Sequence, residues 1–412
     1  MNQPHDPLAH RKGAVSLRLT APDGAPLTNQ EVEIRQVRHK FLFGSAGFDL
    51  PLMNGELSGE RKELAERRMD KMTDLFNAVT LPFYWGGFEP VQGKPDTRRL
   101  MQAARWLTER GIRVKGHPLC WHTVCANWLL PLSNAEILRT QLARIEREVT
   151  TFKGLIDMWD VINEVVIMPI FDRYDNGMTR VCKELGRIRM VKEVFAAARA
   201  ANPAAVLLIN DFDMSPAYDI LVEGCLEAGI PIDVIGLQSH MHQGYWGVEK
   251  TQRILEQFSR FNLPIHFTET NIVSGHLMPP EIVDLNDYQV ESWPSTPEGE
   301  ERQAGEVMTH YKTLFAHPLV QGLTWWDFAD GGWLNSPAGL IRADASSKPA
   351  YTELLRHIKG EWWTGSLRLQ TDAAGRAAFT GFLGDYELSA AGNCVSFCLD
   401  QNQPAEFNLA LH

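Results

Sequence analysis

Between residues 40 and 360, short apolar runs alternate with longer segments whose apolar residues recur at helical spacing. The runs show no alternation of apolar and polar positions, which is typical of strands covered on both faces. The longer segments, such as residues 59–76 and 134–152, predict amphipathic helices. The eight runs that we interpret as strands are Lys40–Gly44, Asn77–Leu81, Ile112–His117, Ile156–Asn163, Ala205–Asn210, Ile232–Gln238, Leu263–Thr268 and Gly322–Trp326.

Eight strands, each followed by a helix, over about 320 residues predict an α/β protein with a closed (β/α)8 TIM barrel and insertions. A doubly wound open sheet also alternates strands with helices, so it is the competing architecture. Because the first run is not followed by the G-x-G-x-x-G turn of such folds, the barrel is favoured.

The flanks of this region have a different pattern. Residues 15–24 and 31–37, and several short segments after residue 362, alternate apolar with polar positions and are broken by Gly, Asp or Asn. About seven strands from the two termini can pair into one accessory β-sandwich, and two independent β caps are the alternative. We therefore predict β-strands of an accessory module in residues 1–38 and 363–412, and the barrel in residues 39–362.

Composition narrows the partners and the compartment. A formal net charge of −11 argues against nucleic acid or an anionic membrane as partner, and a neutral sugar is compatible with it. The first residues carry no apolar stretch of a secretory signal, so we expect a cytoplasmic protein unless the chain is a processed, secreted form. The six scattered cysteines include no C-x-x-C pair, which favours reduced core residues over disulfides or a metal site.

The reactive residues of a TIM barrel lie where strands end and βα loops begin. The polar and aromatic residues at these positions are His117, Asn163–Glu164, Asn210–Asp211, Gln238, His240, Glu269 and Trp325–Trp326. Two carboxylates, Glu164 and Glu269, therefore face one mouth of the barrel. Glycoside cleavage with retention needs two such groups, about 5–5.5 Å apart. The alternative is that the two are unrelated loop carboxylates in salt bridges.

The local sequences at these positions resemble, in order, those of the family 10 glycoside hydrolases, the xylanase family. The segments that carry the resemblance are KFLFGSAGF, GHPLCWH, IDMWDVINEVV, LLINDFD, VIGLQSHMH, FTETNI, TWWDF followed by GGWL, and GLIRADASSKPAY. The resemblance covers roughly residues 40–360 and does not reach the flanking strands. It implies hydrolysis of β-1,4-xylosidic bonds with retention and without a cofactor.

The resemblance also implies a role for individual residues. It makes Glu164 the acid/base, whose pKa the negative charge of Glu269 should raise, and Glu269 the nucleophile. Asn163 would donate to the sugar 2-hydroxyl, and His240 would hydrogen-bond the nucleophile. The remaining residues that we assign to substrate binding are His117, Gln238, Trp121, Trp325 and Trp333. For the histidines and indoles the alternative is a place in the core, which applies more to Trp121 than to Trp333.

Two segments depart from the family pattern. After the second strand, the family's Glu-Asn-x-x-Lys stretch is replaced by TLPFYWGGFEP, and the glutamine of the third strand is replaced by Val124. We interpret the glycone subsites as rebuilt with Tyr84 and Trp85. The long segment from Asn271 to about Ser295 is positioned to close the cleft into a pocket. Both departures predict better activity on short or aryl glycosides than on long xylan.

Other functions remain open at this point. One is a retaining β-glycosidase for a different sugar or a decorated glycoside, and another is a carbohydrate-binding relative without activity. A magnesium-dependent barrel enzyme needs a cluster of carboxylates, for which Asp211 and Asp213 are the only nearby candidates, so we expect no metal and no cofactor. The expected partner is an oligo- or polysaccharide, and the sequence does not fix the oligomeric state.

Overall fold

The computed structural model describes residues 6–50, 57–390 and 392–410, and its chain divides into two compact units. One unit comprises residues 1–42, 314–318 and 351–412, and the other comprises residues 43–313 and 319–350. Residues 1–5, 391 and 411–412, which we assigned to the accessory module, lie outside the described residues.

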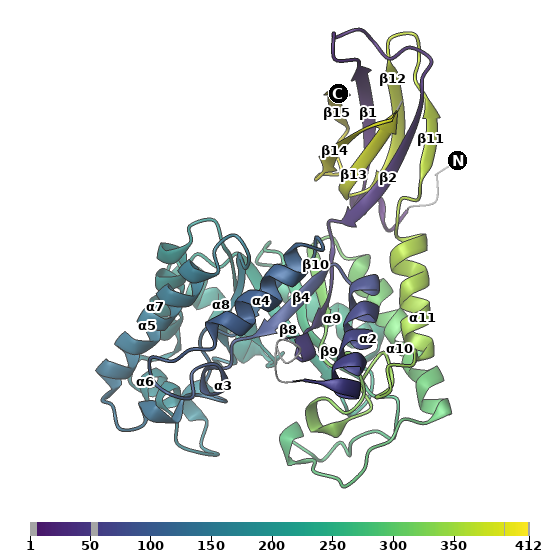
Figure 1. Cartoon of the computed structure of the whole chain (residues 1–412). Coiled ribbons are helices and arrows are strands. Elements are labelled where there is room, and N and C mark those ends of the chain that lie inside the picture. The colour runs from purple at the N-terminus through teal and green to yellow at the C-terminus, as the bar shows by residue number, and fades with distance from the viewer. Residues whose placement is uncertain (1–5, 51–56, 391, 411–412) are drawn as a thin grey trace. The chain divides into compact units, whose positions relative to one another are not determined.

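The larger unit contains a closed barrel of eight parallel strands, which confirms the TIM barrel and excludes the open sheet (Figure 1). Each strand overlaps a run that we interpreted as a strand. Around the barrel the strands follow one another in chain order, and β10 closes the circle against β3. The strands are β3 (Leu42–Ala46), β4 (Ala78–Pro82), β5 (Arg113–His117), β6 (Met158–Asn163), β7 (Val206–Asp211), β8 (Val234–Met241), β9 (Ile265–Ile272) and β10 (Val320–Trp325).

Helices surround these strands (Figure 1). They are α2 (Gly59–Leu75), α3 (Trp85–Phe88), α4 (Thr97–Thr108), α5 (Asn134–Thr151), α6 (Gly177–Leu185), α7 (Arg187–Ala201), α8 (Pro216–Glu227), α9 (Gly247–Ser259) and α10 (Pro297–Phe315). The amphipathic ones bury their apolar residues, such as Leu100 of α4 and Ile145 of α5. The last helix, α11 (Pro349–Arg356), falls mostly in the smaller unit. Single turns lie at Ala9–Arg11, Asn127–Leu129, Met168–Ile170, Leu285–Asp287, Trp333–Asn335 and His357–Glu361. In the described part of the chain, no helix is both long and apolar enough to cross a membrane.

The smaller unit contains a β-sandwich. Its strands are β1 (Lys12–Thr20), β2 (Glu31–His39), β11 (Leu367–Gln370), β12 (Arg376–Phe382), β13 (Gly384–Ala390), β14 (Asn393–Leu399) and β15 (Ala405–Ala410). One sheet has the order β12-β1-β15 and the other the order β11-β2-β13-β14, so each sheet combines strands from both ends of the chain. This pairing confirms the single accessory sandwich and excludes two independent caps.

The period-two pattern explains why these strands pack face to face. On β1, Val15, Leu17 and Leu19 point inward, and exposed positions lie between them. They join one apolar cluster with residues of the other sheet, such as Ile34 and Leu388. A strand with one apolar face is stable only when that face is covered, and here strands from the opposite terminus cover it.

The cysteines only partly meet expectation. All six are free thiols, and Cys120, Cys182 and Cys225 are buried in the larger unit. Cys394 and Cys398, however, are exposed on β14, which corrects their predicted place in the core. Both cysteines lie on the outer face of β14, because side chains alternate along a strand. The residues that alternate with them, such as Phe397, lie on the face that covers the sandwich core.

Candidate active site

The register of the barrel strands brings the polar strand-end residues side by side. Asn163 on β6 pairs with Asn210 on β7, and on β8 and β9 Gln238 pairs with Glu269. Because all strands are parallel, their carboxyl ends meet at one mouth, and the side chains of these four residues are almost fully buried there.

Glu269 is held by hydrogen-bond donors on both carboxylate oxygens. The Asn210 side-chain amide donates to Oε1 over 3.0 Å, and His240 Nε2 lies 3.1 Å from Oε2. His117 Nε2 lies 3.8 Å from Oε1. The carboxylate is only 4% exposed, so these partners replace most of its hydration. The charged form of Glu269 is thus fixed in one orientation.

Glu164 follows directly after β6, at a position where the backbone has a positive φ of 55°. The Trp121 indole N–H donates to its Oε2 over 2.9 Å, while the side-chain amides of Asn163 and Gln238 each donate to Oε1 over 3.3 Å. Burial, followed by the charge of Glu269, raises the pKa of Glu164 to about 7. We expected the charge of Glu269 to raise the pKa of Glu164, but burial contributes more to the rise than this charge.

The two carboxylates are joined by one network of amide side chains. Asn210 Nδ2 also donates to Asn163 Oδ1 over 2.8 Å, and Gln238 Nε2 donates to the same oxygen over 3.1 Å. Gly236 makes room for this network, because a Cβ there would lie 2.5 Å from Asn210 Oδ1. Asn210 was noted at a strand end but not assigned to the site, and its strand-end position was the available signal.

His117 lies at the end of β5 and is fixed by a buried carboxylate. Its Nδ1 lies 2.7 Å from Asp160 Oδ2, which is also 2.6 Å from Lys115 Nζ. Burial alone would raise the pKa of Asp160, but Lys115 and His117 outweigh it and lower the pKa. Asp160 lies within a strand, so the strand-end rule did not find it. It orients His117 with Nε2 toward Glu269.

Aromatic rings line one side of the carboxylate pair. Trp326 packs edge-on against His117, with ring centroids 5.2 Å apart, and Tyr84 does the same at 5.8 Å. The Tyr84 and Trp121 centroids are 5.6 Å apart, and Trp333 lies 4.8 Å from His240. Tyr84, Trp121 and Trp333 therefore lie beside residues that contact the two carboxylates, and their part in sugar binding stays a prediction.

The structure corrects two other aromatic placements. Trp325 is fully buried and donates its indole N–H to the Ala338 carbonyl, so it packs in the interior, and its neighbour Trp326 faces the site instead. Successive side chains of a strand point to opposite faces, so an error of one residue exchanges the two. Trp85 lies in α3, where its indole donates to Glu89 and its ring packs against Trp128 at 5.5 Å, so its contacts are with these residues and not with Glu164 or Glu269.

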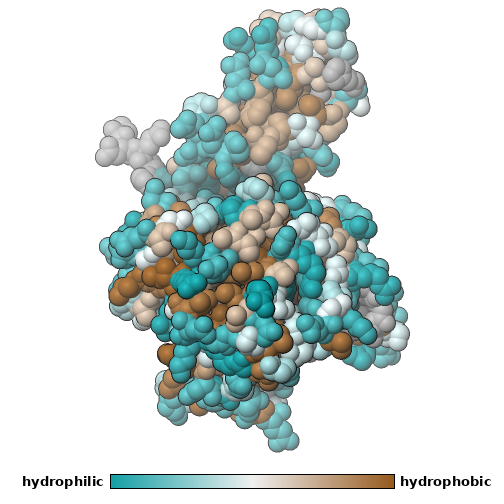
Figure 2. All heavy atoms as spheres, turned by 90° about the vertical axis from the view of Figure 1, so that its left-hand side faces the viewer, coloured by the Kyte–Doolittle hydropathy of each residue, from teal (hydrophilic) through white to brown (hydrophobic). Residues whose placement is uncertain are grey.

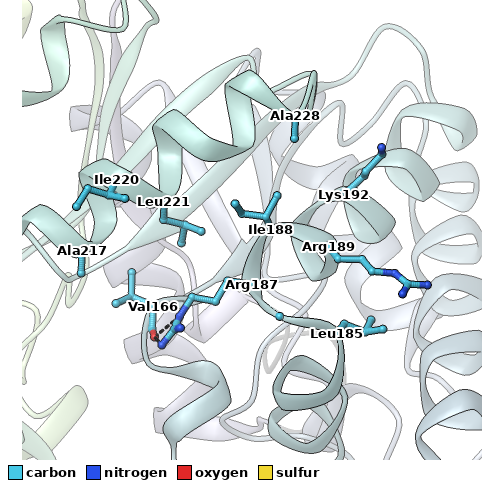
Figure 3. Close-up of a pocket in the computed structure, with 11 residues that line it drawn as sticks. Val166, Leu185, Arg187, Ile188, Arg189, Lys192, Ala217, Ile220, Leu221 and Ala228 are labelled. Carbon is cyan, nitrogen blue, oxygen red and sulfur yellow. Dashed lines mark hydrogen bonds between the residues drawn. The ribbon is translucent and has the colours of Figure 1, made fainter.

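The segment after Glu164 is anchored from two sides. Arg187 donates two hydrogen bonds, of 2.8 and 2.6 Å, to the Val166 carbonyl (Figure 3). Asp211 accepts a hydrogen bond from the Val166 amide. These contacts hold the unusual backbone of Glu164 in place. Val166 and Arg187 also line a cavity of about 800 Å³ between the ends of α6, α7 and α8, to which neither glutamate contributes.

The surface around this cavity is partly apolar. Hydrophobic side chains gather on the face of the barrel unit that carries α5 to α7 (Figure 2). Among the described residues, Ile170, Ile188 and Ile220 are 69%, 40% and 64% exposed. The carboxylates lie apart from this surface, at the mouth of the barrel.

The long segment after β9 is folded around a small apolar core of its own. Val273, Met278 and Trp293 are buried in it together with Ala338. Arg173, in the loop after β6, forms ion pairs with Asp284, at 2.5 Å, and with Asp287 of this segment. Two loops from separate strands are thus tied together at the mouth of the barrel.

Metal binding has no visible basis in the described residues, because no three His, Cys, Asp or Glu side chains are arranged around a common point there. Asp211, one candidate from the sequence, accepts hydrogen bonds from the backbone amides of Val166 and Asp213. Burial raises the pKa of Asp211 to about 8.

Comparisons with known proteins agree with this architecture. The family model described as glycosyl hydrolase family 10 matches residues 42–357. Endo-1,4-beta-xylanase 2 of Arabidopsis thaliana is 24% identical over 413 residues, which cover 96% of this chain and 34% of that protein. The endo-1,4-beta-xylanase/feruloyl esterase of Xylanibacter ruminicola is 26% identical over 292 residues, covering 63% of this chain and 39% of that protein.

This chain therefore spans only 34% to 39% of the length of these two relatives. Among solved structures, xylanase 10B from Thermotoga petrophila RKU-1 in complex with xylobiose superposes with a TM-score of 0.63 at 22% identity. The match covers 78% of this chain and 95% of that chain. At this level of identity the likeness shows the barrel fold.

Proposed function

Because this chain belongs to glycosyl hydrolase family 10, we propose that it is a retaining glycoside hydrolase that cleaves β-1,4-xylosidic or closely related β-glycosidic bonds. The observation that carries this proposal is the contrast between the two carboxyl groups. Glu164 has a pKa raised to about 7, whereas Glu269 is surrounded by donors that stabilise its charge. A retaining enzyme needs one acid and one ionised nucleophile.

In the first step, a lone pair of Glu269 attacks the anomeric carbon and the glycosidic C–O bond breaks. Glu164 gives its proton to the departing oxygen, so that an alcohol leaves and a glycosyl ester forms on Glu269. The Trp121 indole N–H stabilises the carboxylate that Glu164 becomes.

In the second step, water attacks the same carbon and the ester bond to Glu269 breaks. Glu164 takes the proton of this water and is restored as an acid. Asn163 donates to the sugar 2-hydroxyl, a contact that strengthens as positive charge develops on the ring. Both inversions occur at one carbon, so the product keeps the β configuration.

The rings beside the carboxylates supply the sugar-binding surface. Tyr84, Trp121, Trp326 and Trp333 present aromatic faces and edges on which the apolar face of a sugar stacks. His117 and Gln238 supply hydrogen bonds in the same subsite.

We further propose that short oligosaccharides or aryl β-glycosides are better substrates than long xylan. The ion pairs of Arg173 tie the loops after β6 and β9 together, which narrows the path for a long chain. Val124, at the position of a polar family residue, is 45% exposed and offers no hydrogen bond to a sugar. Each lost hydrogen bond weakens binding by roughly 0.5–1.5 kcal/mol.

The test is incubation with a panel of polysaccharides, xylo-oligosaccharides and aryl glycosides, with product lengths resolved over time. We expect β-xylosidic substrates to be cleaved, with the short ones preferred. Cleavage confined to another sugar would identify a β-glycosidase of the same mechanism. Binding without any cleavage would contradict the proposal and identify a carbohydrate-binding relative.

A further inference from the structure

A chain of hydrogen bonds runs from Glu269 to a carboxylate that the proposed mechanism does not use. Glu269 Oε2 lies 3.1 Å from His240 Nε2, and His240 Nδ1 lies 2.6 Å from Asn271 Oδ1. Asn271 Nδ2 in turn donates to Asp327 Oδ2 over 3.2 Å. The last member, Asp327, lies two residues after the end of β10 and is only 3% exposed.

The donor and acceptor of each hydrogen bond in this series follow from the Asp327 carboxylate at its end. An ionised carboxylate only accepts, so Asp327 turns the NH₂ group of Asn271 toward itself. The amide oxygen of Asn271 then faces His240, and because an amide oxygen only accepts, His240 Nδ1 carries a proton. On its other side His240 faces Glu269, a second acceptor. The ring satisfies both neighbours only when both nitrogens are protonated.

We propose that Asp327 is a positioning residue that, through Asn271, holds His240 as an imidazolium cation against Glu269. The cation stabilises the negative charge that Glu269 needs before it attacks the anomeric carbon. The inference rests on the nucleophilic role of Glu269 proposed above, but the charge of His240 can be measured without any substrate.

The surroundings of Asp327 support its place as a fixed acceptor. Its Oδ1 accepts a hydrogen bond from the backbone N–H of Trp333 over 3.1 Å. Gly332 permits this approach, because a Cβ at that residue would lie 2.2 Å from Asp327 Oδ1. Burial raises the pKa of Asp327 to about 6, so the group is ionised at neutral and higher pH. At neutral pH the Asp327 carboxylate can therefore orient the side chain of Asn271.

The charges that face His240 come from several elements. Glu269 on β9, Asp327 after β10 and Glu164 after β6 are acids, and His242, directly after β8, is the neighbouring base. Burial opposes a charge on His240, but the hydrogen bond and charge of Glu269, with Asn271 and Asp327, outweigh it and raise the pKa of His240. Burial, followed by the charge of His240, lowers the pKa of His242 to about 3, so His242 adds no competing cation at neutral pH.

The first test is nuclear magnetic resonance of the full chain with ¹⁵N-labelled histidine, in which the His240 signals are assigned by their loss in His240→Gln. At pH 7 we expect both His240 nitrogens to have shifts typical of imidazolium. A neutral imidazole spectrum would overturn the proposal, whether or not the protein hydrolyses glycosides. Failure of the proposed function would instead appear as an intact imidazolium without hydrolysis.

The second test uses Asp327→Asn, whose amide still accepts from Trp333 N–H but presents NH₂ to Asn271. Asn271 must then rotate and donate to His240 Nδ1, which leaves a neutral ring that donates only to Glu269. We expect the acidic limb of the pH profile of kcat/KM to move up by roughly one pH unit. The control Asp344→Asn, in an exposed loop, should leave the limb in place.

The double variant Asn271→Asp with Asp327→Asn restores an acceptor beside His240 Nδ1 and a donor beside the new carboxylate. We expect it to return the acidic limb to the wild-type position. A limb that does not move in Asp327→Asn, or that stays displaced in the folded double variant, would show that Asp327 serves only the fold. If Asp327→Asn does not fold, the double variant and the histidine spectra decide the question.

Discussion

Trp121 donates its indole N–H to Glu164 Oε2 over 2.9 Å, so the group proposed as general acid has a donor aimed at its charged form. This contact lowers the pKa of Glu164, against burial and the charge of Glu269, which raise it to about 7. These opposing effects suit both roles proposed for Glu164, which must hold a proton in the first step and accept one in the second.

The pH dependence follows from this balance. Glu164 must be protonated in the first step, so kcat/KM should fall as the pH rises through about 7. Trp121→Phe removes a contact that favours the carboxylate, so the pKa of Glu164 should rise and the basic limb should move up by about half to one pH unit. The control Trp128→Phe, whose indole donates to the Glu89 carbonyl, should leave the basic limb unchanged. A downward shift in Trp121→Phe would contradict the assigned acid.

A second pair of variants distinguishes the role of Glu269 from that of Glu164. Glu269→Ala should abolish hydrolysis of every substrate, because no glycosyl ester can form. Glu164→Ala should lower activity on poor leaving groups by about 10²–10⁴-fold but spare the first step for activated aryl glycosides. Azide should restore turnover of Glu164→Ala and give a glycosyl azide of retained configuration. A glycosyl azide of inverted configuration would show that Glu164 is the nucleophile and Glu269 the acid/base.

Much of this site was accessible from sequence, for a physical reason. Strands buried on both faces give continuous apolar runs, and a barrel places its chemistry at their carboxyl ends, so Asn163, Glu164, Gln238, His240 and Glu269 all fall at predicted places. The structure joins these five through Asn210 into one hydrogen-bond network.

The remaining positions depend on packing that the sequence pattern does not encode. In the pair Trp325 and Trp326, both residues are apolar and both are buried, so no polar position reveals which one faces the mouth. Trp85 lies in a loop after a barrel strand, where site residues are expected, but the short helix α3 turns its ring toward Trp128. Asp160, inside β6, and Asp327, two residues after the end of β10, become part of the site only through their partners.

The tie between the loops gives a prediction on substrate length. Arg173→Met removes the ion pairs with Asp284 and Asp287, so the two loops should separate more easily. The ratio of kcat/KM for xylohexaose to that for an aryl β-xylobioside should rise by roughly two- to thirtyfold, since two exposed pairs contribute about 0.4–2 kcal/mol.

A matched control for this prediction is Arg260→Met, because Arg260 also pairs with two partly exposed carboxylates, Asp219 and Glu223. It should leave the ratio unchanged. If the wild-type ratio is already well above one and Arg173→Met does not alter it, the cleft is open and endo-acting.

The accessory sandwich gives a prediction on stability. Leu17 is fully buried in its core, so Leu17→Ala should lower the free energy of unfolding of this unit by about 2–5 kcal/mol. Arg18→Ala, on the exposed face of the same strand, should change it by less than about 0.5 kcal/mol. Denaturant unfolding followed for both variants makes the comparison. Equal effects would show that the apolar cluster between the sheets does not stabilise the unit.

Removal of the last fifty residues extends this argument. It deletes the strands that flank β1 in one sheet and β2 in the other, so both apolar faces would be uncovered. We expect aggregation of the truncated chain, measured by light scattering during gentle heating. A soluble truncated protein with an unchanged melting temperature would contradict the role given to these strands.

The central claim is that Glu269 forms a covalent bond to the sugar. A 2-deoxy-2-fluoro aryl β-xylobioside slows both steps, and its good leaving group lets the first step proceed, so the glycosyl-enzyme should accumulate. Mass spectrometry of the intact chain should show the addition of one fluoro-xylobiosyl group, and peptide mapping should place it on Glu269. An adduct on another residue, or no adduct in an enzyme whose first-formed product has the inverted configuration, would contradict the account.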